Sequence, residues 1–194
     1  MNLSNRMDTR VVLETRYGML EIQIYALHAP ASAAAFLRLV DDGSLAIYGA
    51  FYRVVRKNDN DFGPAAIDVI QGGLRKAPVQ LDRIPHESTS SSGLRHVDGT
   101  VSLARGAPGS ASGATFFICI GDQPSLDAGG ARSGDGEGYA AFGRLVAGWQ
   151  TARKIHELPT SVDAAEHPRM QNQILDPTVR IERTLRRPAA VGIA

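Results

Sequence analysis

One arginine occupies a position where a strand usually carries an apolar side chain. Arg53 lies in the stretch AFYRVV, between Tyr52 and Val54, and half-buried strands favour branched and aromatic residues. A guanidinium stays charged and holds five N–H donors in one plane, so it can stabilise a developing charge or a lone pair. Arginines in strands are more often solvated surface charges, and Arg53 taken alone favours that interpretation. The chemical interpretation therefore depends on the residues around it.

Other candidate motifs lack the spacing that their chemistry needs. Neither PGSASGA nor TSSSGL has the G-x-S-x-G spacing of a hydrolase nucleophile. The glycine-rich GGARSGDGEG contains neither the G-K-S/T ending of a P-loop nor the G-x-G-x-x-G pattern of a dinucleotide-binding loop. The five histidines are scattered, with no helical pair of the kind that binds zinc. The single cysteine, Cys119 in FFICI, excludes an internal disulfide and is typical of a small buried hydrophobe. These patterns give no support to hydrolase, nucleotide-binding or metal chemistry.

Length and composition indicate one ordinary folded domain. The chain has 194 residues, 43% hydrophobic and 21% charged, with a net charge of +1, so it is neither disordered by composition nor basic enough for nucleic acid. We expect a single domain over residues 1–194, with flexible ends at 1–9 and 187–194.

The N-terminal stretch MNLSNRMDTR lacks the apolar segment of a signal peptide, and no apolar run reaches the length of a bilayer span. We expect a cytoplasmic location on this sequence, or a periplasmic one if a signal segment has been removed.

Alternation of apolar and polar residues predicts several short strands. In GMLEIQIY, Leu20, Ile22 and Ile24 share one face, and the preceding TRVVLET is expected to pair with it through a turn at 16–18. Gly18 supplies any positive φ that this turn needs. Further strands are predicted at AFYRVV, IDVIQGG, GTVSLA, TFFICI, AAFGRLV and TVRIERTL.

Two segments have helical spacing instead. Phe36, Leu37 and Val40 fall on one stripe of APASAAAFLRLVDDG, and Trp149 and Ile155 do so in GWQTARKIHEL. About eight strands with only two helices, and no alternation of strand and helix, favour a mainly β fold, either an antiparallel barrel or a sandwich. Two widely separated helices suit a barrel whose open ends they cover.

Three ordered stretches resemble the cyclophilin-type peptidyl-prolyl cis-trans isomerases. They are FYRVV followed by VIQGG, then GTVSLARGAPGSASGATFFICI, then SLD followed by YAAFGRLVAGW. The first hairpin and helix and the final ILDPTVRIERTL also look like those of the family, so the resemblance covers nearly the whole chain. It implies a closed eight-stranded antiparallel β-barrel capped by two α-helices. It also implies an outer groove that binds an extended Xaa-Pro segment, and no metal or organic cofactor.

The resemblance assigns roles to individual residues. Arg53 matches the catalytic arginine of the family, which stabilises the twisted amide before proline. Phe117 matches the residue under the proline ring, whereas the preceding Phe116 must point into the barrel core because strand side chains alternate. The other matches in the substrate-binding groove are Val69, Gln71, Ala104, Arg105, Thr115, Leu126 and Tyr139. We expect Arg105 to act through its main chain and its side chain to be a solvent-facing charge.

Four positions depart from the common pattern of the family. It usually has an aromatic residue at Asp68, glutamine at Thr115, tryptophan or phenylalanine at Ser125 and histidine at Tyr139. Thr115 is shorter and reaches fewer peptide groups, and Ser125 removes an apolar wall associated with cyclosporin, so we expect weak binding of that inhibitor. Residues 56–66 form an insertion in which Phe62 is the only aromatic residue. We hypothesise that Phe62 folds back to replace the missing wall.

The leading hypothesis is a peptidyl-prolyl isomerase that acts on exposed Xaa-Pro bonds of unfolded or flexible chains and so assists folding. Its expected partners are proline-containing polypeptides, with no nucleic acid and no membrane, and we expect a monomer. The alternative is a proline-peptide binding or chaperone-like module with little isomerase turnover, which the departures at Asp68, Thr115 and Ser125 favour. A third interpretation is an unrelated barrel that binds a small ligand.

Overall fold

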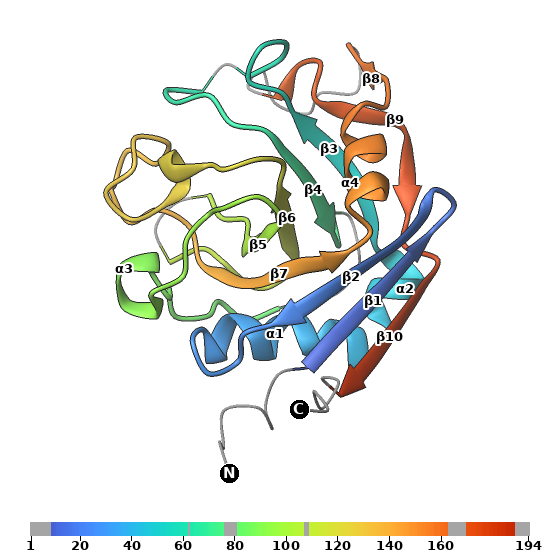
Figure 1. The fold of residues 1–194 in the computed structure, drawn as a ribbon, viewed down its shortest axis with the longest axis horizontal. Coiled ribbons are helices and arrows are strands. Elements are labelled where there is room, and N and C mark those ends of the chain that lie inside the picture. Colours follow the sequence, from blue (N-terminus) through green and yellow to red (C-terminus); the bar gives the residue numbers. More distant parts are fainter. Residues whose placement is uncertain (1–8, 62, 76–80, 107–108, 163–169, 189–194) are drawn as a thin grey trace, which may run out of the picture.

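Ten strands form one antiparallel sheet that curls into a barrel (Figure 1). The computed structural model describes residues 9–61, 63–75, 81–106, 109–162 and 170–188. The order of the strands in the sheet is β10-β1-β2-β7-β5-β6-β4-β3-β9-β8. Their bounds are β1 (Thr9–Thr15), β2 (Gly18–Ile24), β3 (Ala50–Val55), β4 (Val69–Gly73), β5 (Thr100–Leu103), β6 (Thr115–Cys119), β7 (Ala141–Ala147), β8 (Thr160–Ser161), β9 (Ile174–Arg180) and β10 (Arg183–Pro188).

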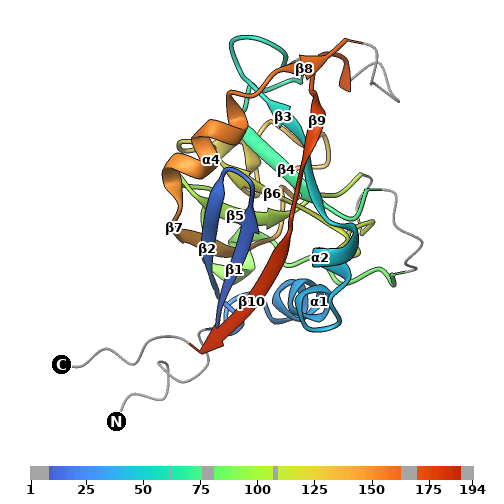
Figure 2. The same ribbon diagram turned by 90° about the vertical axis from the view of Figure 1, so that its right-hand side faces the viewer.

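The last strands close the barrel. β9 pairs with β3 and β10 pairs with β1, yet only Ile181 and Glu182 separate β9 from β10. Across this junction the Ile181 N–H donates to the Gly49 carbonyl at 3.0 Å, and the Glu182 N–H donates to the Glu14 carbonyl at 2.8 Å. β9 and β10 therefore act as one bent strand that joins both edges of the sheet (Figure 2). With β9 and β10 counted as one strand and the two-residue β8 left out, eight strands surround the core, which confirms the predicted eight-stranded barrel.

The first hairpin has the predicted turn. Thr15 pairs with Gly18, so only Arg16 and Tyr17 lie between β1 and β2. Gly18 has a φ of 125°, a conformation that side chains disfavour, and the Thr15 hydroxyl donates to its carbonyl at 2.9 Å. The Thr15 oxygen also accepts the Tyr17 N–H at 3.2 Å. These contacts fix the register of the sheet from its first turn.

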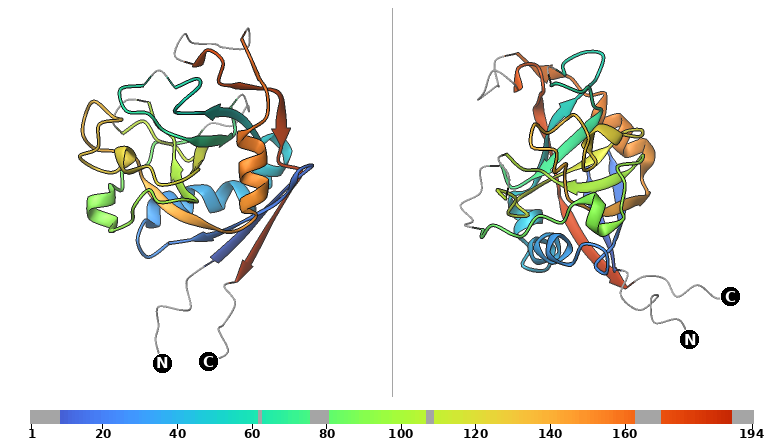
Figure 3. Two further views of the ribbon diagram at one scale, coloured as in Figure 1. Left: turned by 45° about the horizontal axis from the view of Figure 1, so that its top comes forward. Right: turned by 90° about the vertical axis from the view of Figure 1, so that its left-hand side faces the viewer.

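Both predicted helices are present, and they lie at opposite ends of the barrel (Figures 2 and 3). α1 (Pro30–Asp41) begins with a proline and buries Phe36 and Leu39, whereas α4 (Trp149–His156) buries Ala152 and Ile155. The described residues also include short helical segments that the sequence analysis did not predict. They are α2 (Ser44–Tyr48), α3 (Thr89–Ser92) and the 3-10 turn η2 (Pro124–Leu126).

The barrel interior is packed around four phenylalanines. Phe116 meets Phe36 with ring centroids 5.3 Å apart and Phe51 at 5.8 Å, and Phe36 also meets Phe142 at 5.2 Å. All four side chains are fully buried, so they form the centre of the main apolar core. Phe116 therefore points inward, as the alternation along its strand predicted.

The first and last described residues of the chain pair in the sheet. Thr9 pairs with Pro188 and Arg10 pairs with Arg187. Thr9, Arg187 and Pro188, which fall in the segments expected to be flexible (1–9 and 187–194), lie in β1 and β10, and the rest of both segments lies outside the described residues. Among the described helices, none is long and apolar enough to cross a membrane.

Candidate active site

A second apolar cluster lies on the outer wall of the barrel, separate from the main core. It consists of Val55, Ile67, Val69, Phe117, Cys119 and Leu126, with Ala104 and Tyr139 packed against it. Alternation along the strands explains its position, because β4 and β6 send Ile70 and Phe116 inward and the neighbouring Val69 and Phe117 outward. The cluster provides an apolar surface that faces away from the barrel interior.

The strand register sets a polar row beside this cluster. Arg53 on β3 pairs with Gln71 on β4, and Gln71 pairs with Phe117 on β6. A side chain at Gly73, where β4 ends, would collide with the Ala114 carbonyl, which explains the glycine at this position of VIQGG. The register therefore brings a cation, an amide and an aromatic ring side by side.

A cavity of about 340 Å³ opens over the row and the cluster. It is lined by all nine residues that the sequence analysis selected: Arg53, Val69, Gln71, Ala104, Arg105, Thr115, Phe117, Leu126 and Tyr139. Seven further residues of the described part of the chain line it, namely Val55, Ile67, Gly106, Ser110, Ser112, Arg132 and Met170. The structure therefore collects every selected position around one groove.

Two neutral amides hold the Arg53 guanidinium. Its Nε and Nη2 donate to the Gln173 Oε1 at 2.8 and 2.6 Å, and its Nη1 donates to the Gln71 Oε1 at 2.9 Å. Gln71 in turn donates from Nε2 to the Tyr52 hydroxyl at 2.9 Å. Burial lowers the pKa of Arg53 from its ordinary value, but an arginine remains protonated in proteins. Arg53 is thus a partly buried, oriented cation rather than a solvated surface charge.

The Phe117 ring is fixed from two sides. Tyr139 meets it edge to face, with centroids 5.5 Å apart, and the His96 ring stacks against it at 6.0 Å. His96 is itself buried, with Nδ1 at 2.8 Å from the Asp127 Oδ1 and Nε2 at 3.1 Å from the Ser102 hydroxyl. Burial lowers the pKa of the His96 imidazole, although the bond to Asp127 opposes this.

The sequence analysis missed the role of His96, which it treated as one of five scattered histidines. The sequence held one indication of this role: Asp127, which contacts His96, directly follows Leu126 of the predicted groove.

The expectation of a solvent-facing Arg105 is wrong. Only 4% of its side chain is exposed, because both Nη atoms donate to the Asp135 carboxylate, at 2.7 and 2.8 Å, and Nε donates to the Gly138 carbonyl at 2.8 Å. The guanidinium also lies over the Tyr139 ring, 5.2 Å from its centroid. The hydrogen bond to Asp135 raises the pKa of Arg105 and holds the pKa of Asp135 well below its usual value. Arg105 therefore supports Tyr139 from the side of the 127–138 loop.

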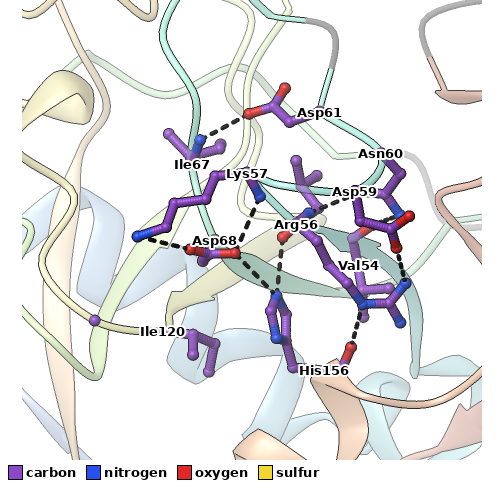
Figure 4. A network of polar contacts seen from close by, with 12 residues as sticks. Val54, Arg56, Lys57, Asp59, Asn60, Asp61, Ile67, Asp68, Ile120 and His156 are labelled. Atoms are coloured by element: carbon purple, nitrogen blue, oxygen red, sulfur yellow. Dashed lines mark hydrogen bonds and ion pairs between the residues drawn. The ribbon is translucent and has the colours of Figure 1, made fainter.

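The Asp68 side chain contacts Lys57 of the insertion and His156 (Figure 4), and it does not line the cavity. The Asp68 carboxylate accepts the Lys57 N–H at 3.1 Å and lies 3.6 Å from the Lys57 Nζ and 3.7 Å from the His156 Nε2. Ile67, which directly precedes Asp68, lines the cavity instead. Ser125 does not line the cavity either. Phe62 lies outside the described residues, so its hypothesis stays a prediction.

A buried ion pair connects the insertion to the 127–138 loop. The Arg132 Nη1 lies 2.8 Å from both oxygens of Asp61, whose side chain is fully buried. The same carboxylate accepts the Ile67 N–H at 2.7 Å. Because Arg132 and Ile67 both line the cavity, this pair ties two loops into one wall of the groove. The sequence analysis missed the pair, since Asp61 and Arg132 are far apart in the chain.

Comparison with known proteins decides the family. The family model "Cyclophilin type peptidyl-prolyl cis-trans isomerase/CLD" matches residues 10–183. The chain belongs to this family. It is a cyclophilin-type peptidyl-prolyl cis-trans isomerase by class, and the cyclophilin family binds proline-containing peptides. The interpretation as an unrelated barrel is therefore wrong.

The relatives are moderately similar in sequence. A peptidyl-prolyl cis-trans isomerase of Acinetobacter baylyi is 30% identical over 158 residues, which cover 79% of this chain and 75% of that protein. The peptidyl-prolyl cis-trans isomerase A of Dickeya dadantii is 30% identical over 157 residues, covering 79% and 74%. An isomerase of Arabidopsis thaliana is 29% identical, and this chain spans 62% of its length.

Solved structures support the same fold. The crystal structure of a cyclophilin-type isomerase of Cryptosporidium parvum matches with a TM-score of 0.68 and 19% identity, over 93% of this chain and 98% of that one. The comparison and the strand order therefore agree on a cyclophilin barrel.

Among the described residues of our chain, no group of three or more histidine, cysteine or acidic side chains is placed to hold a metal ion.

Proposed function

We propose that the groove binds an extended Xaa-Pro segment and that Arg53 lowers the barrier to rotation about the prolyl amide. The supporting observation is the position of an oriented cation beside an apolar seat. Arg53, Phe117 and Leu126 line one cavity, and Phe117 is held between Tyr139 and His96. A proline ring on Phe117 would place its amide within reach of the guanidinium.

The chemistry needs no nucleophile. Rotation about an Xaa-Pro bond has a barrier of about 18–20 kcal/mol, because the C–N bond has double-bond character. In the twisted state resonance is lost, the nitrogen becomes pyramidal and basic, and a nearby cation or donor stabilises it. Lowering the barrier by about 5 kcal/mol gives a rate gain of roughly three to four powers of ten.

The hydrogen bonds of Arg53 suit this task. With the described residues it uses three of its five N–H groups, which leaves two for a substrate. Both of its acceptors, Gln71 and Gln173, are neutral amides, so they orient the guanidinium without neutralising it. We therefore assign to Arg53 the stabilisation of the twisted amide.

The remaining groove residues are proposed to contact the peptide before proline. The Ala104 N–H already donates to the Thr115 carbonyl at 3.0 Å, so Ala104 would offer its carbonyl oxygen. A Cryptosporidium parvum cyclophilin of the same fold, with a TM-score of 0.61, was solved in the presence of the dipeptide Ala-Pro, which supports a short prolyl ligand. We propose exposed Xaa-Pro bonds in unfolded or flexible polypeptides as substrates of a monomer.

The test is cis/trans exchange of an Xaa-Pro peptide, measured by NMR exchange spectroscopy with catalytic amounts of protein. We expect Arg53→Ala to lose most of the rate enhancement with little change in urea stability. Arg144→Ala removes a strand arginine outside the groove and is expected to keep the parent rate. Equal rates for Arg53→Ala and the parent would refute the role of Arg53. Peptide binding by the parent without faster exchange would favour the alternative, a proline-binding module.

A further inference from the structure

Gln173 contacts Arg53 from outside the groove. It directly precedes β9, is only 1% exposed and does not line the cavity. Its single Oε1 accepts two N–H groups of Arg53, from Nε at 2.8 Å and from Nη2 at 2.6 Å. Two donors on one edge of the guanidinium fix both its plane and its direction.

A glutamine can do this only if its amide is turned the right way. A flipped amide would present its NH2 group to Arg53, and two donors would then face each other. The Gln173 Nε2 donates to the Asn60 carbonyl at 2.5 Å, and this bond holds the Oε1 toward Arg53. Asn60 therefore sets the orientation of the group that orients Arg53.

Asn60 is in turn locked into the inserted segment. Its side chain is buried, with Nδ2 donating to the Asn172 carbonyl at 2.6 Å and Oδ1 accepting the Arg56 N–H at 2.7 Å. The Arg56 carbonyl accepts the N–H groups of Asp59, Asn60 and Asp61, each at 3.1 Å, which closes a tight turn. Hydrogen bonds thus close the turn at 56–61 around Asn60.

Arg56 anchors this turn to the end of α4 (Figure 4). Its Nε donates to the His156 carbonyl at 2.8 Å, and its Nη2 donates to the Leu158 carbonyl at 2.5 Å. Carbonyl groups at a helix C-terminus lack partners within the helix and favour a cation, so this contact is stable. A continuous chain of hydrogen bonds therefore runs from α4 through the inserted turn to Gln173 and Arg53.

We propose that Gln173 is a positioning residue for Arg53 and that the inserted turn at 56–61 holds Gln173 in its active orientation. This inference rests on the proposed role of Arg53. Since Gln173 does not line the cavity, its loss affects turnover rather than peptide binding. The insertion is then part of the catalytic apparatus rather than a loop added to the surface.

The test compares Gln173→Met with Gln123→Met. Methionine keeps the length of the side chain but lacks the amide oxygen. Gln123 is also buried, and its Nε2 donates to the Ile120 carbonyl at 2.7 Å rather than to Arg53. We expect Gln173→Met to lower kcat by about 10- to 100-fold, the range for losing hydrogen bonds to a charged group, with KM within about twofold of the parent. Gln123→Met is expected to keep the parent kcat.

A second readout does not depend on activity. The Arg53 Nε–H signal in an NMR spectrum, assigned by its absence in Arg53→Lys, should exchange slowly with water in the parent. We expect this exchange to be at least about tenfold faster in Gln173→Met. It should also be faster in Asn60→Ala, which removes the side-chain hydrogen bonds of Asn60 within the turn and leaves the Arg53 side chain unchanged. Asn60→Ala keeps the inference testable if Gln173→Met does not fold.

The outcomes separate this inference from the proposed function. If Arg53→Ala leaves isomerisation unchanged, the proposed function fails whatever the Nε–H signal does. If Arg53→Ala slows isomerisation but Gln173→Met changes neither kcat nor the exchange of the Nε–H, Gln173 is not a positioning residue. If Gln173→Met raises KM and leaves kcat unchanged, the positioning role is refuted as well, because Gln173 would then act in peptide binding.

Discussion

Replacing Asp61 with alanine tests whether two loops build one wall of the groove. The Asp61 side chain is fully buried, 11% of the Arg132 side chain is exposed, and the Arg132 Nη1 lies 2.8 Å from both carboxylate oxygens. The substitution leaves Arg132 with the Ala65 carbonyl, 2.8 Å away, as its acceptor among the described residues. A buried cation without its countercharge is costly.

The expected loss in the free energy of unfolding follows from this burial. Removing one partner of a buried ion pair costs about 3–5 kcal/mol. Arg132 lines a cavity that water can enter, so we expect the lower end, about 3 kcal/mol. The Ile67 N–H, which donates to the Asp61 Oδ2 at 2.7 Å, also loses its acceptor. Because Ile67 belongs to the groove wall, affinity for an Xaa-Pro peptide is expected to fall in the same variant.

Urea denaturation followed by the fluorescence of the single tryptophan, Trp149, measures the loss. Asp41→Ala is the control, since Asp41 pairs with Arg186 and both side chains are nearly half exposed. Such surface pairs contribute about 0–1 kcal/mol. The double variant Asp61→Ala/Arg132→Met should lose less than the sum of the single variants. If Asp61→Ala costs no more than Asp41→Ala and the Ile67 amide keeps its hydrogen-exchange protection, the two-loop wall is refuted.

Three further predictions concern other parts of the groove. Burial lowers the pKa of His96, so the unfolded chain binds its proton more readily, and stability should fall as the pH drops below about 6.5. The urea midpoints of the parent and His96→Asn at pH 7.5 and 5.5 check this, and an equal pH dependence in both would contradict it. Burial raises the pKa of the Cys119 thiol well above its ordinary value, so a thiol reagent should label Cys119 in urea and not in the folded protein; rapid labelling of the folded protein would be the opposite result. Cyclosporin should inhibit weakly in a titration of isomerase activity, and inhibition at stoichiometric concentration would show that prediction to be wrong.

Much of the fold was predictable because its signals are local. The alternation of Leu20, Ile22 and Ile24 marks one face of β2, and Pro30 marks the start of α1. The groove residues were predicted from the resemblance to the cyclophilin family rather than from strand pairing. The structure shows how these residues meet, because VIQGG and TFFIC pair in the register that sets Gln71 beside Phe117.

The remaining features depend on partners that are distant in the chain. The Arg105 side chain is covered because it pairs with Asp135, 30 residues later, and His96 meets Asp127 at a separation of 31 residues. Gln173 contacts Arg53 across 120 residues. Asp68 precedes β4, so alternation along that strand does not fix its direction. No periodic pattern in the sequence specifies contacts of this kind.

The most direct test of the account is the exchange rate of an Xaa-Pro peptide with the parent protein at about one hundredth of the peptide concentration. Uncatalysed exchange takes roughly tens to hundreds of seconds. The account predicts exchange cross-peaks on the timescale of a second or less, and their loss in Arg53→Ala. A parent protein that binds the peptide and leaves its cis/trans exchange at the uncatalysed rate would contradict it.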